Sequence, residues 1–393
     1  MNTKSNKVKR KPWLSRLNSW LHLWLGISSG IIVVIVALTG TLFVFCDDII
    51  DAMAGKSQYV QEVQTRRQSP EALLAAFSKD HPGLKPFSIQ VYKDPSRTAR
   101  IGAGDKAGHF SFTWIDPYTG RSLVTSGAYY FFYVVAHVHS GEMPFGHTGN
   151  LIVQIATWIF LIELITGLVL WWPARWTRAA RKQRFTIKWK ASFKRVNYDL
   201  HNVPGFYSLI PALMITITGL VIINDTVKRS THQLFGSKPD AFKYMRSKAP
   251  AYDSSRQFVT MNELLNNLLQ EPSAAQVRLS IPKDSATTVF AMSGRELGLK
   301  ALDGRMFMIN RYTGKEMEFP ENIRRGLQVD GMNMNLHIGF WAGWLGKILT
   351  AVAGLICAAL PVTGFLIWWG KRNNKKHQRT SVSVSKSSKT SLA

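Results

Sequence analysis

The chain has 393 residues, a formal net charge of +25 and an apolar content of 46 %. Because only 19 % of its residues are charged, a disordered tail and a histone-like polycation are both excluded. Its two cysteines, Cys46 and Cys357, are too few for a disulfide scaffold, and the sequence has no Cys-x-x-Cys pair for zinc or iron–sulfur chemistry.

Four stretches of the sequence are long and apolar enough to cross a bilayer as a helix, which takes about 20 residues. They run from about His22 to Phe45, Gly149 to Trp172, Pro204 to Ile223 and Gly346 to Trp369. We therefore expect a mainly α-helical membrane protein built on a four-helix transmembrane bundle.

The positive charge lies next to these stretches. Residues 1–16 contain six basic residues and no acid, residues 173–203 contain nine basic residues and one acid, and residues 371–393 contain seven basic residues and no acid. The positive-inside rule places these three segments in the cytoplasm and the two long, nearly neutral segments on the other side. Nucleic-acid binding is not expected, because it needs the charge gathered on one folded domain.

The sequence contains an internal repeat. Six residues recur 179 positions later, so that Asn18, His22, Gly26, Ser29, Thr39 and Gly40 match Asn197, His201, Gly205, Ser208, Thr218 and Gly219. The second and fourth stretches share Thr-Gly-x3-Trp-Trp, at Thr166 and Thr363, and each follows a His-x-Gly, at His139 and His337. Each half therefore consists of a helix, an outer segment and a second helix, in a parallel duplication.

The two outer segments also resemble each other. Each has a short helical pattern, then alternating strands, then a Tyr-Thr-Gly turn. The expected helices are Pro70–Phe77 and Met261–Leu269, and the expected strands are Phe87–Tyr92, His109–Ile115, Ala275–Ile281 and Arg305–Ile309. We expect two small α+β modules.

Four histidines lie at the ends of the expected helices. His22 and His201 open the first and third helices at the cytoplasmic edge, while His139 and His337 precede the second and fourth at the opposite edge. Each end of the bundle thus has two histidines, and bundle cores are where facing side chains hold cofactors. A structural role, in which each histidine is a hydrogen-bonded core residue, stays open.

Small residues follow the histidines along one helical stripe, Gly26 and Ser29 after His22, and Gly205 and Ser208 after His201. Small side chains leave room for a ring beside its ligand, although close helix packing uses the same residues. They favour a flat cofactor over a bare metal ion.

Two imidazoles per iron suit a six-coordinate b-type haem, whose role is electron transfer. A structural zinc site would need four nitrogen or sulfur ligands close together. The sequence therefore predicts two bis-histidine b-type haems, with His22 and His201 as the axial iron ligands of one, and His139 and His337 as those of the other.

Several motifs resemble one known family. They are Leu-His-x-Trp-x-Gly at the start of the first helix, Asp-Leu-His-Asn at residues 199–202, Thr-Gly-Leu-Val-Leu-Trp-Trp-Pro at residues 166–173 and Asp-Pro-Tyr-Thr-Gly at residues 116–120. They resemble the PepSY-associated transmembrane family, which includes iron-regulated inner-membrane proteins and ferric-siderophore reductases of the ferrioxamine B reductase type. The resemblance covers nearly the whole chain and implies four membrane helices with two periplasmic PepSY modules.

For the reductase members, the resemblance implies two haems that move electrons outward to a ferric siderophore. It carries the ligand roles onto His22, His201, His139 and His337, with His137 as an alternative to His139. The expected protein is an inner-membrane oxidoreductase with both termini in the cytoplasm, which reduces ferric siderophore iron in the periplasm and releases ferrous iron. A separate cytoplasmic electron donor is expected, because the sequence has no nucleotide-binding glycine motif.

Glu163 lies alone near the middle of the second apolar stretch. Carboxylates inside membranes are costly and usually functional, so Glu163 is a candidate proton relay. Two other functions stay open: a permease for iron or siderophore, and a non-catalytic PepSY protein for binding or sensing.

The expected segments follow from these observations. They are a basic tail (1–16), the first helix (17–46), the first module (47–136), a histidine segment with the second helix (137–173), a basic loop (174–200), the third helix (201–224), the second module (225–331), a histidine segment with the fourth helix (332–370) and a disordered tail (371–393).

Overall fold

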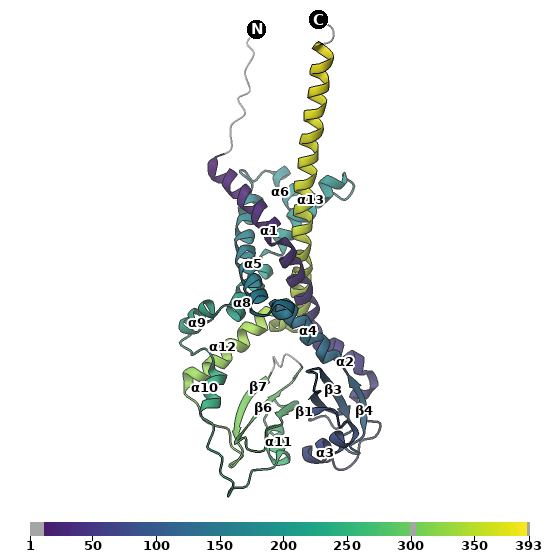
Figure 1. The fold of residues 1–393 in the computed structure, drawn as a ribbon, viewed down its shortest axis with the longest axis vertical. Helices are drawn as coiled ribbons and strands as arrows, with labels where there is room; N and C mark the ends of the chain where they lie inside the picture. Colours follow the sequence, from purple (N-terminus) through teal and green to yellow (C-terminus); the bar gives the residue numbers. More distant parts are fainter. Residues whose placement is uncertain (1–11, 299–303, 391–393) are drawn as a thin grey trace. The chain divides into compact units, whose positions relative to one another are not determined.

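The computed structural model describes residues 12–298 and 304–390 (Figure 1). The chain divides into two compact units, each assembled from segments that are far apart in the sequence. The first unit contains Met1–Thr41, Val138–Asn224 and His337–Ala393, and the second contains Leu42–His137 and Asp225–Leu336. Most of the basic tail expected at residues 1–16 lies outside the described residues.

The first unit is helical. Its elements are α1 (Trp13–Val44), α5 (Glu142–Trp171), α6 (Arg178–Phe185), α7 (Phe193–Tyr207), α8 (Leu209–Ile223), the short 3-10 helix η2 (Phe340–Ala342) and α13 (Gly343–Thr390). Within this unit α13 packs against α7 and α8, and α5 packs against α8. Residues 371–390, expected as a disordered tail, continue α13.

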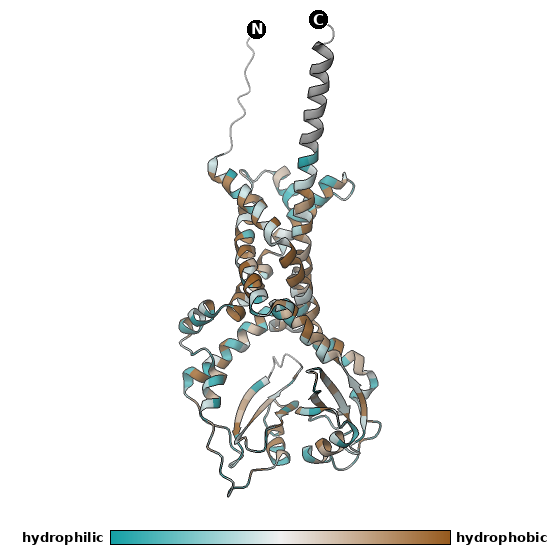
Figure 2. Cartoon of the chain, viewed as in Figure 1, coloured by the Kyte–Doolittle hydropathy of each residue, from teal (hydrophilic) through white to brown (hydrophobic). Residues whose placement is uncertain are grey.

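Three helical stretches among the described residues are long and apolar enough to span a bilayer: Trp13–Val44, Ala128–Trp171 and Phe340–Asn373. The pair formed by α7 and α8 makes a fourth if it counts as one bent span. The ribbon of these helices is largely in the hydrophobic colour in Figure 2. Many of their large apolar side chains are exposed, and Ile31 and Ile210 are 76 % and 79 % exposed. Such a surface is stable when lipid covers it.

The third apolar stretch is not one straight helix from Pro204, as the sequence suggested. Its helix begins at Phe193 and bends by 65° at Ser208, between α7 and α8. Pro204 lies inside α7, where its missing N–H and its ring interrupt the hydrogen-bond ladder, and Gly205 follows it. The break therefore comes from Pro204 and Gly205, which were expected at the start of the helix and lie inside it.

The second unit contains one antiparallel sheet of seven strands in the order β4-β3-β2-β1-β5-β6-β7. The strands are β1 (Lys85–Tyr92), β2 (Ala99–Gly104), β3 (Phe110–Ile115), β4 (Ser122–Ser126), β5 (Gln276–Ser280), β6 (Thr288–Gly294) and β7 (Gly304–Asn310). The two outer segments, expected as separate modules, meet where β1 pairs with β5 and Ile89 lies opposite Leu279. They therefore share one sheet.

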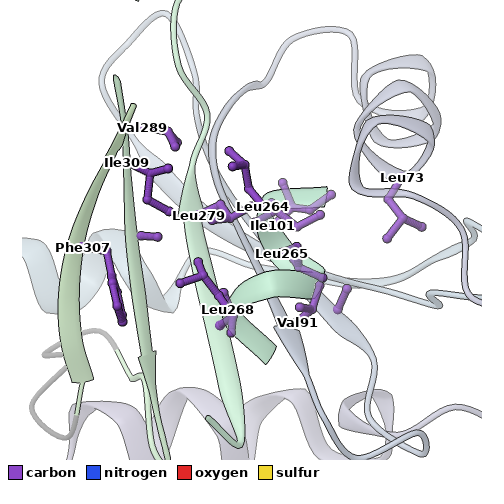
Figure 3. Packing of buried hydrophobic residues seen from close by; sticks show 14 of the residues in the cluster. Leu73, Val91, Ile101, Leu264, Leu265, Leu268, Leu279, Val289, Phe307 and Ile309 are labelled. Atoms are coloured by element: carbon purple, nitrogen blue, oxygen red, sulfur yellow. The ribbon is translucent and has the colours of Figure 1, made fainter. Parts of the chain in front are cut away.

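One face of this sheet is covered by α3 (Pro70–Asp80) and α11 (Met261–Leu269), at the positions expected from the sequence. Their side chains, Leu73 and Leu264 among them, pack with Ile101, Leu279 and other strand residues in one apolar core (Figure 3). Successive strand residues alternate between the two faces, so this core takes alternate residues of β1, β2, β5, β6 and β7, such as Ile89 and Val91 of β1.

The opposite face is covered in two places. α2 (Cys46–Ala54) and α4 (Ala128–Ser140) pack on Phe112 and Trp114 of β3, and α10 (Ala241–Ser247) and α12 (Glu321–His337) pack on Met308 of β7. The short 3-10 helix η1 (Gly55–Gln58) and α9 (Asp225–Leu234) complete the unit. α4 and α12 were not expected as helices from the sequence, although His139 and His337 lie in their last turns.

Candidate functional site

The four predicted ligands form two pairs inside the first unit. The ring centres of His22, on α1, and His201, on α7, lie 6.3 Å apart. Those of His139 and His337 lie 6.1 Å apart. We call His22 with His201 the first pair, and His139 with His337 the second pair.

Each ring of the first pair is held by a neighbouring helix through a Thr-Gly dipeptide. Nδ1 of His22 lies 3.0 Å from Oγ1 of Thr166, on α5, and Nδ1 of His201 lies 2.9 Å from Oγ1 of Thr363, on α13. The glycine that follows each threonine leaves room for the ring, because a Cβ at Gly167 would lie 3.1 Å from Cε1 of His22.

The second pair is held in the same way. Nδ1 of His337 lies 3.0 Å from Oγ1 of Thr218, and Nδ1 of His139 lies 3.4 Å from Oγ1 of Thr39. Here backbone carbonyls also accept from Nδ1: Val36 O at 2.8 Å for His139 and Ile215 O at 3.0 Å for His337. Both contacts come from the helix turn that contains the threonine.

The glycines of the second pair lie equally close to the rings. A Cβ at Gly40 would lie 2.7 Å from Cε1 of His139, and one at Gly219 would lie 3.2 Å from Cε1 of His337. Helix α1 takes part in both kinds of contact, because its His22 contacts Thr166 of α5 and its Thr39 and Gly40 lie against His139 of α4. The same arrangement, in which the Thr-Gly of one helix holds a histidine ring of another, thus occurs four times among the described residues of this unit. We call it the Thr-Gly clamp.

The threonines fix which nitrogen of each ring carries the proton. Each hydroxyl donates to a carbonyl four residues earlier on its own helix; for Thr166 the acceptor is Ile162 O at 2.9 Å, and for Thr363 it is Ala359 O at 2.9 Å. Oγ1 therefore accepts from Nδ1–H of the histidine. The same bonds occur at Thr39 and Thr218. Nε2 of each neutral ring is left with its lone pair, the arrangement that orients a metal-ligating histidine.

The spacing of each pair fits one metal ion between two imidazoles. A ligating imidazole nitrogen lies about 2.0 Å from a first-row metal and its ring centre about 1.1 Å further back, so two opposed rings have centres about 6.2 Å apart. The observed 6.3 and 6.1 Å agree with this value. Within the described residues no group of three or more His, Cys, Asp or Glu side chains is arranged around a metal site, so each pair offers two protein ligands.

A cavity of about 550 Å³ adjoins the first pair, within the range of cofactor sites in proteins. Its walls come from α1, α5, α7, α8 and α13 and include His22, His201, Gly167 and Gly364. The predicted small residues Gly26, Gly205 and Ser29 line it as well, but Ser208 is absent from its lining and lies at the bend between α7 and α8.

Glu163 has a partner that the sequence did not reveal. Its Oε2 lies 3.1 Å from Nδ1 of His22, and a Cβ at Gly26 would lie 3.0 Å from the same oxygen. The side chain is 11 % exposed and also lines the cavity. The glutamate therefore supports the orientation of His22 together with Thr166.

The structure places His139, and not His137, opposite His337. The ring of His137 lies against that of Tyr133, one turn earlier on α4, with 3.9 Å between centres and a tilt of 40° between the ring planes, and its Nδ1 lies 2.8 Å from the Tyr133 carbonyl oxygen. The geometry therefore favours His139 as the ligand-bearing residue of the two.

The His-x-Gly motif ends in a sharp turn in both halves. Gly141 and Gly339 have φ of +80° and +77°, a conformation that favours glycine. A Cβ at either residue would collide with a backbone carbonyl, that of Gly149 or Gly346 respectively. The glycines repeated after His139 and His337 thus allow the chain to turn at once into the following helix.

Comparison with known proteins agrees with this architecture. The sequence model of the family described as the PepSY-associated TM region matches residues 19–371. No curated protein matches the chain.

Proposed function

Since the chain belongs to the PepSY-associated transmembrane family, we propose that it is a di-haem oxidoreductase of the bacterial inner membrane. It takes electrons from a cytoplasmic donor and reduces the iron of a ferric siderophore in the periplasm. The four-helix bundle, the parallel duplication, the periplasmic position of the sheet unit and the cytoplasmic position of both termini belong to the same proposal.

The observation that carries the proposal is that a Thr-Gly dipeptide of a neighbouring helix holds each of the four histidines in the same way. A merely structural histidine needs one hydrogen bond, whereas here four histidines have the same tautomer, the same Thr-Gly support and a partner ring about 6 Å away. Such a set matches the requirements of two bis-histidine sites. A haem bound at each pair would supply one-electron transfer, with the two histidines of the pair as its ligands.

The chain's own residues orient the histidines of the two sites. Thr166 and Thr363 keep Nε2 of the first pair available as a ligand, and Thr39 and Thr218 do the same for the second pair. His22 and Gly40 are 18 residues apart on α1, which is about 27 Å of helix. The two pairs therefore lie at opposite ends of a membrane-length helix, as a transmembrane electron path requires.

The proposed reaction is the transfer of one electron to each ferric ion. Fe(III) in the chelate becomes Fe(II), the siderophore is not itself oxidised, and the electron comes from the cytoplasmic donor. Because Fe(II) is a softer and less tightly held ion for oxygen ligands, it leaves the chelate. Glu163 is the candidate for moving a compensating proton near the first pair.

One observation favours a second candidate, a permease for iron or siderophore. The bend of 65° between α7 and α8 interrupts a membrane-length segment, and broken helices at membrane depth are typical of transporter binding sites. A permease moves the chelate intact, whereas a reductase releases ferrous iron.

The experiment is to reduce the purified chain chemically, add ferric siderophores of different classes and follow reoxidation by absorbance. A ferrous-specific chelator in the same cuvette reports the released Fe(II). The gallium(III) complexes are the matched control, because they have the same shape and charge and do not accept an electron. We expect reoxidation with at least one ferric complex and none with gallium. A chain that no ferric chelate reoxidises, but that carries the chelate into proteoliposomes, is a permease.

A further inference from the structure

The link between α5 and α7 forms a short helix, α6, whose exposed side is basic. Of its eight residues none is acidic, and three are exposed cations, which we call the α6 cations: Arg178, Arg181 and Lys182. The one acid among residues 173–203 is Asp199. It is fully buried on α7, so it does not neutralise the exposed charge of α6.

α6 is held in a fixed position, although a loop that only satisfies the positive-inside rule needs charge and no fixed shape. Oγ1 of Thr177 caps the first turn by accepting a hydrogen bond from the backbone N–H of Ala180 at 3.1 Å. Beyond the helix, Oδ2 of Asp199 accepts from the backbone N–H of Lys188 at 3.1 Å and ties the link to α7. The α6 cations therefore lie on an element that the rest of the unit holds in place.

Aromatic rings join α6 to the cavity beside the first pair. The ring of Phe185, the last residue of α6, lies 5.2 Å from that of Trp171 and 5.4 Å from that of Phe206. Trp171 and Phe206 stack with 3.7 Å between ring centres, and both line the cavity. Trp171 lies one helical turn after Gly167, which belongs to the Thr-Gly clamp of His22. A protein bound at α6 would thus lie one aromatic cluster away from the first pair.

The exposed side of α6 lacks the large apolar residues of a helix that inserts into a lipid surface. Such helices bury large apolar side chains in the membrane and turn their cations to water. The one large apolar residue of α6, Phe185, packs inside the protein, and its other apolar residues are Ala179 and Ala180. Exposed arginines without an apolar face match a negatively charged protein surface better than a lipid surface.

We propose that α6 docks the cytoplasmic electron donor, and that this donor is a protein with an acidic surface and a one-electron redox group. The inference rests on the proposed function, which requires a donor and does not say where it binds. In the transfer the donor loses one electron and the first site gains it, and no bond forms or breaks. The α6 cations attract and orient the donor, so that it binds beside Trp171 and Phe206.

The test measures the binding of flavodoxin, a small acidic flavoprotein that carries single electrons, to the full-length chain in nanodiscs of uncharged lipid. Arg181→Glu reverses one α6 cation. Arg16→Glu, at an exposed arginine of α1, is the matched control, because it changes the net charge by the same amount.

The two variants should differ in how fast flavodoxin associates. At about 0.1 M salt, where charges interact over about 10 Å, Arg181→Glu should lower the association rate constant about tenfold. Arg16→Glu should change it less than about twofold. At about 1 M salt, where charges interact over about 3 Å, all three chains should associate equally slowly.

A second measurement follows electron transfer by rapid mixing. Reduced flavodoxin should reduce the wild-type chain, and Arg181→Glu should slow this reduction to the same degree as it slows binding. Dithionite is a small reductant that needs no docking surface, so it should reduce wild type and Arg181→Glu to the same extent.

A third measurement tests the membrane as the partner. A fluorophore attached to Arg181→Cys should not be quenched by lipids that carry a nitroxide on the headgroup, even when the nanodisc contains anionic lipid. Strong quenching would place α6 on the lipid surface and overturn the docking surface. Flavodoxin binding that is independent of salt, or equally weakened by Arg181→Glu and Arg16→Glu, would also overturn it.

The failure of this inference is distinguishable from that of the proposed function, because flavodoxin binding is measured without reference to haem. If the chain shows two haems that dithionite reduces but the binding tests fail, the docking surface is wrong and the proposed function stands. If the chain shows no haem bands, the proposed function fails, and α6 docks no electron donor whatever its binding of flavodoxin.

Discussion

Nδ1 of His201 donates to the hydroxyl oxygen of Thr363 at 2.9 Å, and the two residues lie on different helices, α7 and α13. The orientation of this imidazole is therefore set by a neighbouring helix and not by its own. The same holds for His22 and Thr166. A ligand site built in this way depends on how the helices pack.

The first prediction follows from that bond. Thr363→Val keeps the shape of the side chain and removes the hydroxyl that accepts from Nδ1, so His201 loses an orienting partner. Loss of such a partner typically lowers metal affinity 10- to 100-fold. Haem titration of the purified variant should show a decrease of that size at the first pair.

Thr216→Val is the matched control for this prediction. Thr216 is buried on α8, and its hydroxyl donates to Ala212 of the same helix. Its replacement should leave haem affinity unchanged. An equal loss of haem affinity in both variants would contradict a specific role for Thr363 in orienting His201.

A second prediction concerns the space beside His139. Gly40→Ala places a methyl group 2.7 Å from Cε1 of the ring, closer than real Cβ contacts allow, so the ring must move. The variant should lose most of one haem per chain and retain the haem of the first pair. Gly331→Ala, where the added Cβ meets nothing within 4 Å, should retain both. Full haem content in the Gly40 variant would mean that His139 is not a ligand.

The sequence predicted the four histidines and their pairing but not the reason for the repeated Thr-Gly dipeptides. Thr39 and Gly40 were visible as repeated positions, yet their role depends on which helix lies beside them, and periodicity along one helix contains no such information. The partner of Glu163 was hidden for the same reason, since His22 is far away in sequence and adjacent only in the packed structure.

The pairing of strands in the sheet is a second feature that could not be predicted from the sequence. Local alternation predicted β1 and β5, and helical periodicity predicted α3 and α11. The pairing of Ile89 with Leu279 joins residues 190 positions apart, and strand patterns alone do not specify their partner. Two similar modules were therefore expected where one continuous sheet forms.

A third prediction tests whether the two halves of the sheet, joined at β1 and β5, unfold together. Leu279 is fully buried in the core that α3 and α11 share with the sheet. Leu279→Ala should reduce the free energy of unfolding of the second unit by about 2–5 kcal/mol. Because β5 pairs with β1, hydrogen exchange should accelerate on both strands. Exchange that accelerates only on β5, β6 and β7 would show that the two halves unfold independently. Val63→Ala, at an exposed side chain, should have little effect.

A fourth prediction concerns pH. In the turn between β2 and β3, hydrogen bonds from His109, first from its backbone N–H and then from its ring, lower the pKa of Asp105 below 3.8. A lowered carboxyl pKa stabilises the folded state above the unfolded pKa, and this contribution is lost as the pH falls through the folded pKa. Asp105→Asn should therefore lower the thermal unfolding midpoint at pH 7, and the difference from wild type should shrink below pH 3.8. A difference independent of pH would contradict this assignment.

The central claim is that four histidines hold two haems, and its most direct measurement is the haem content per chain from the reduced-minus-oxidised spectrum of the purified protein. The account predicts two b-type haems in wild type. His22→Ala and His201→Ala should each remove the same one, and the double variant should remove no more; His139→Ala and His337→Ala should remove the other. A wild-type chain without haem bands, or one that keeps both haems when His22 and His201 are replaced together, would contradict the account.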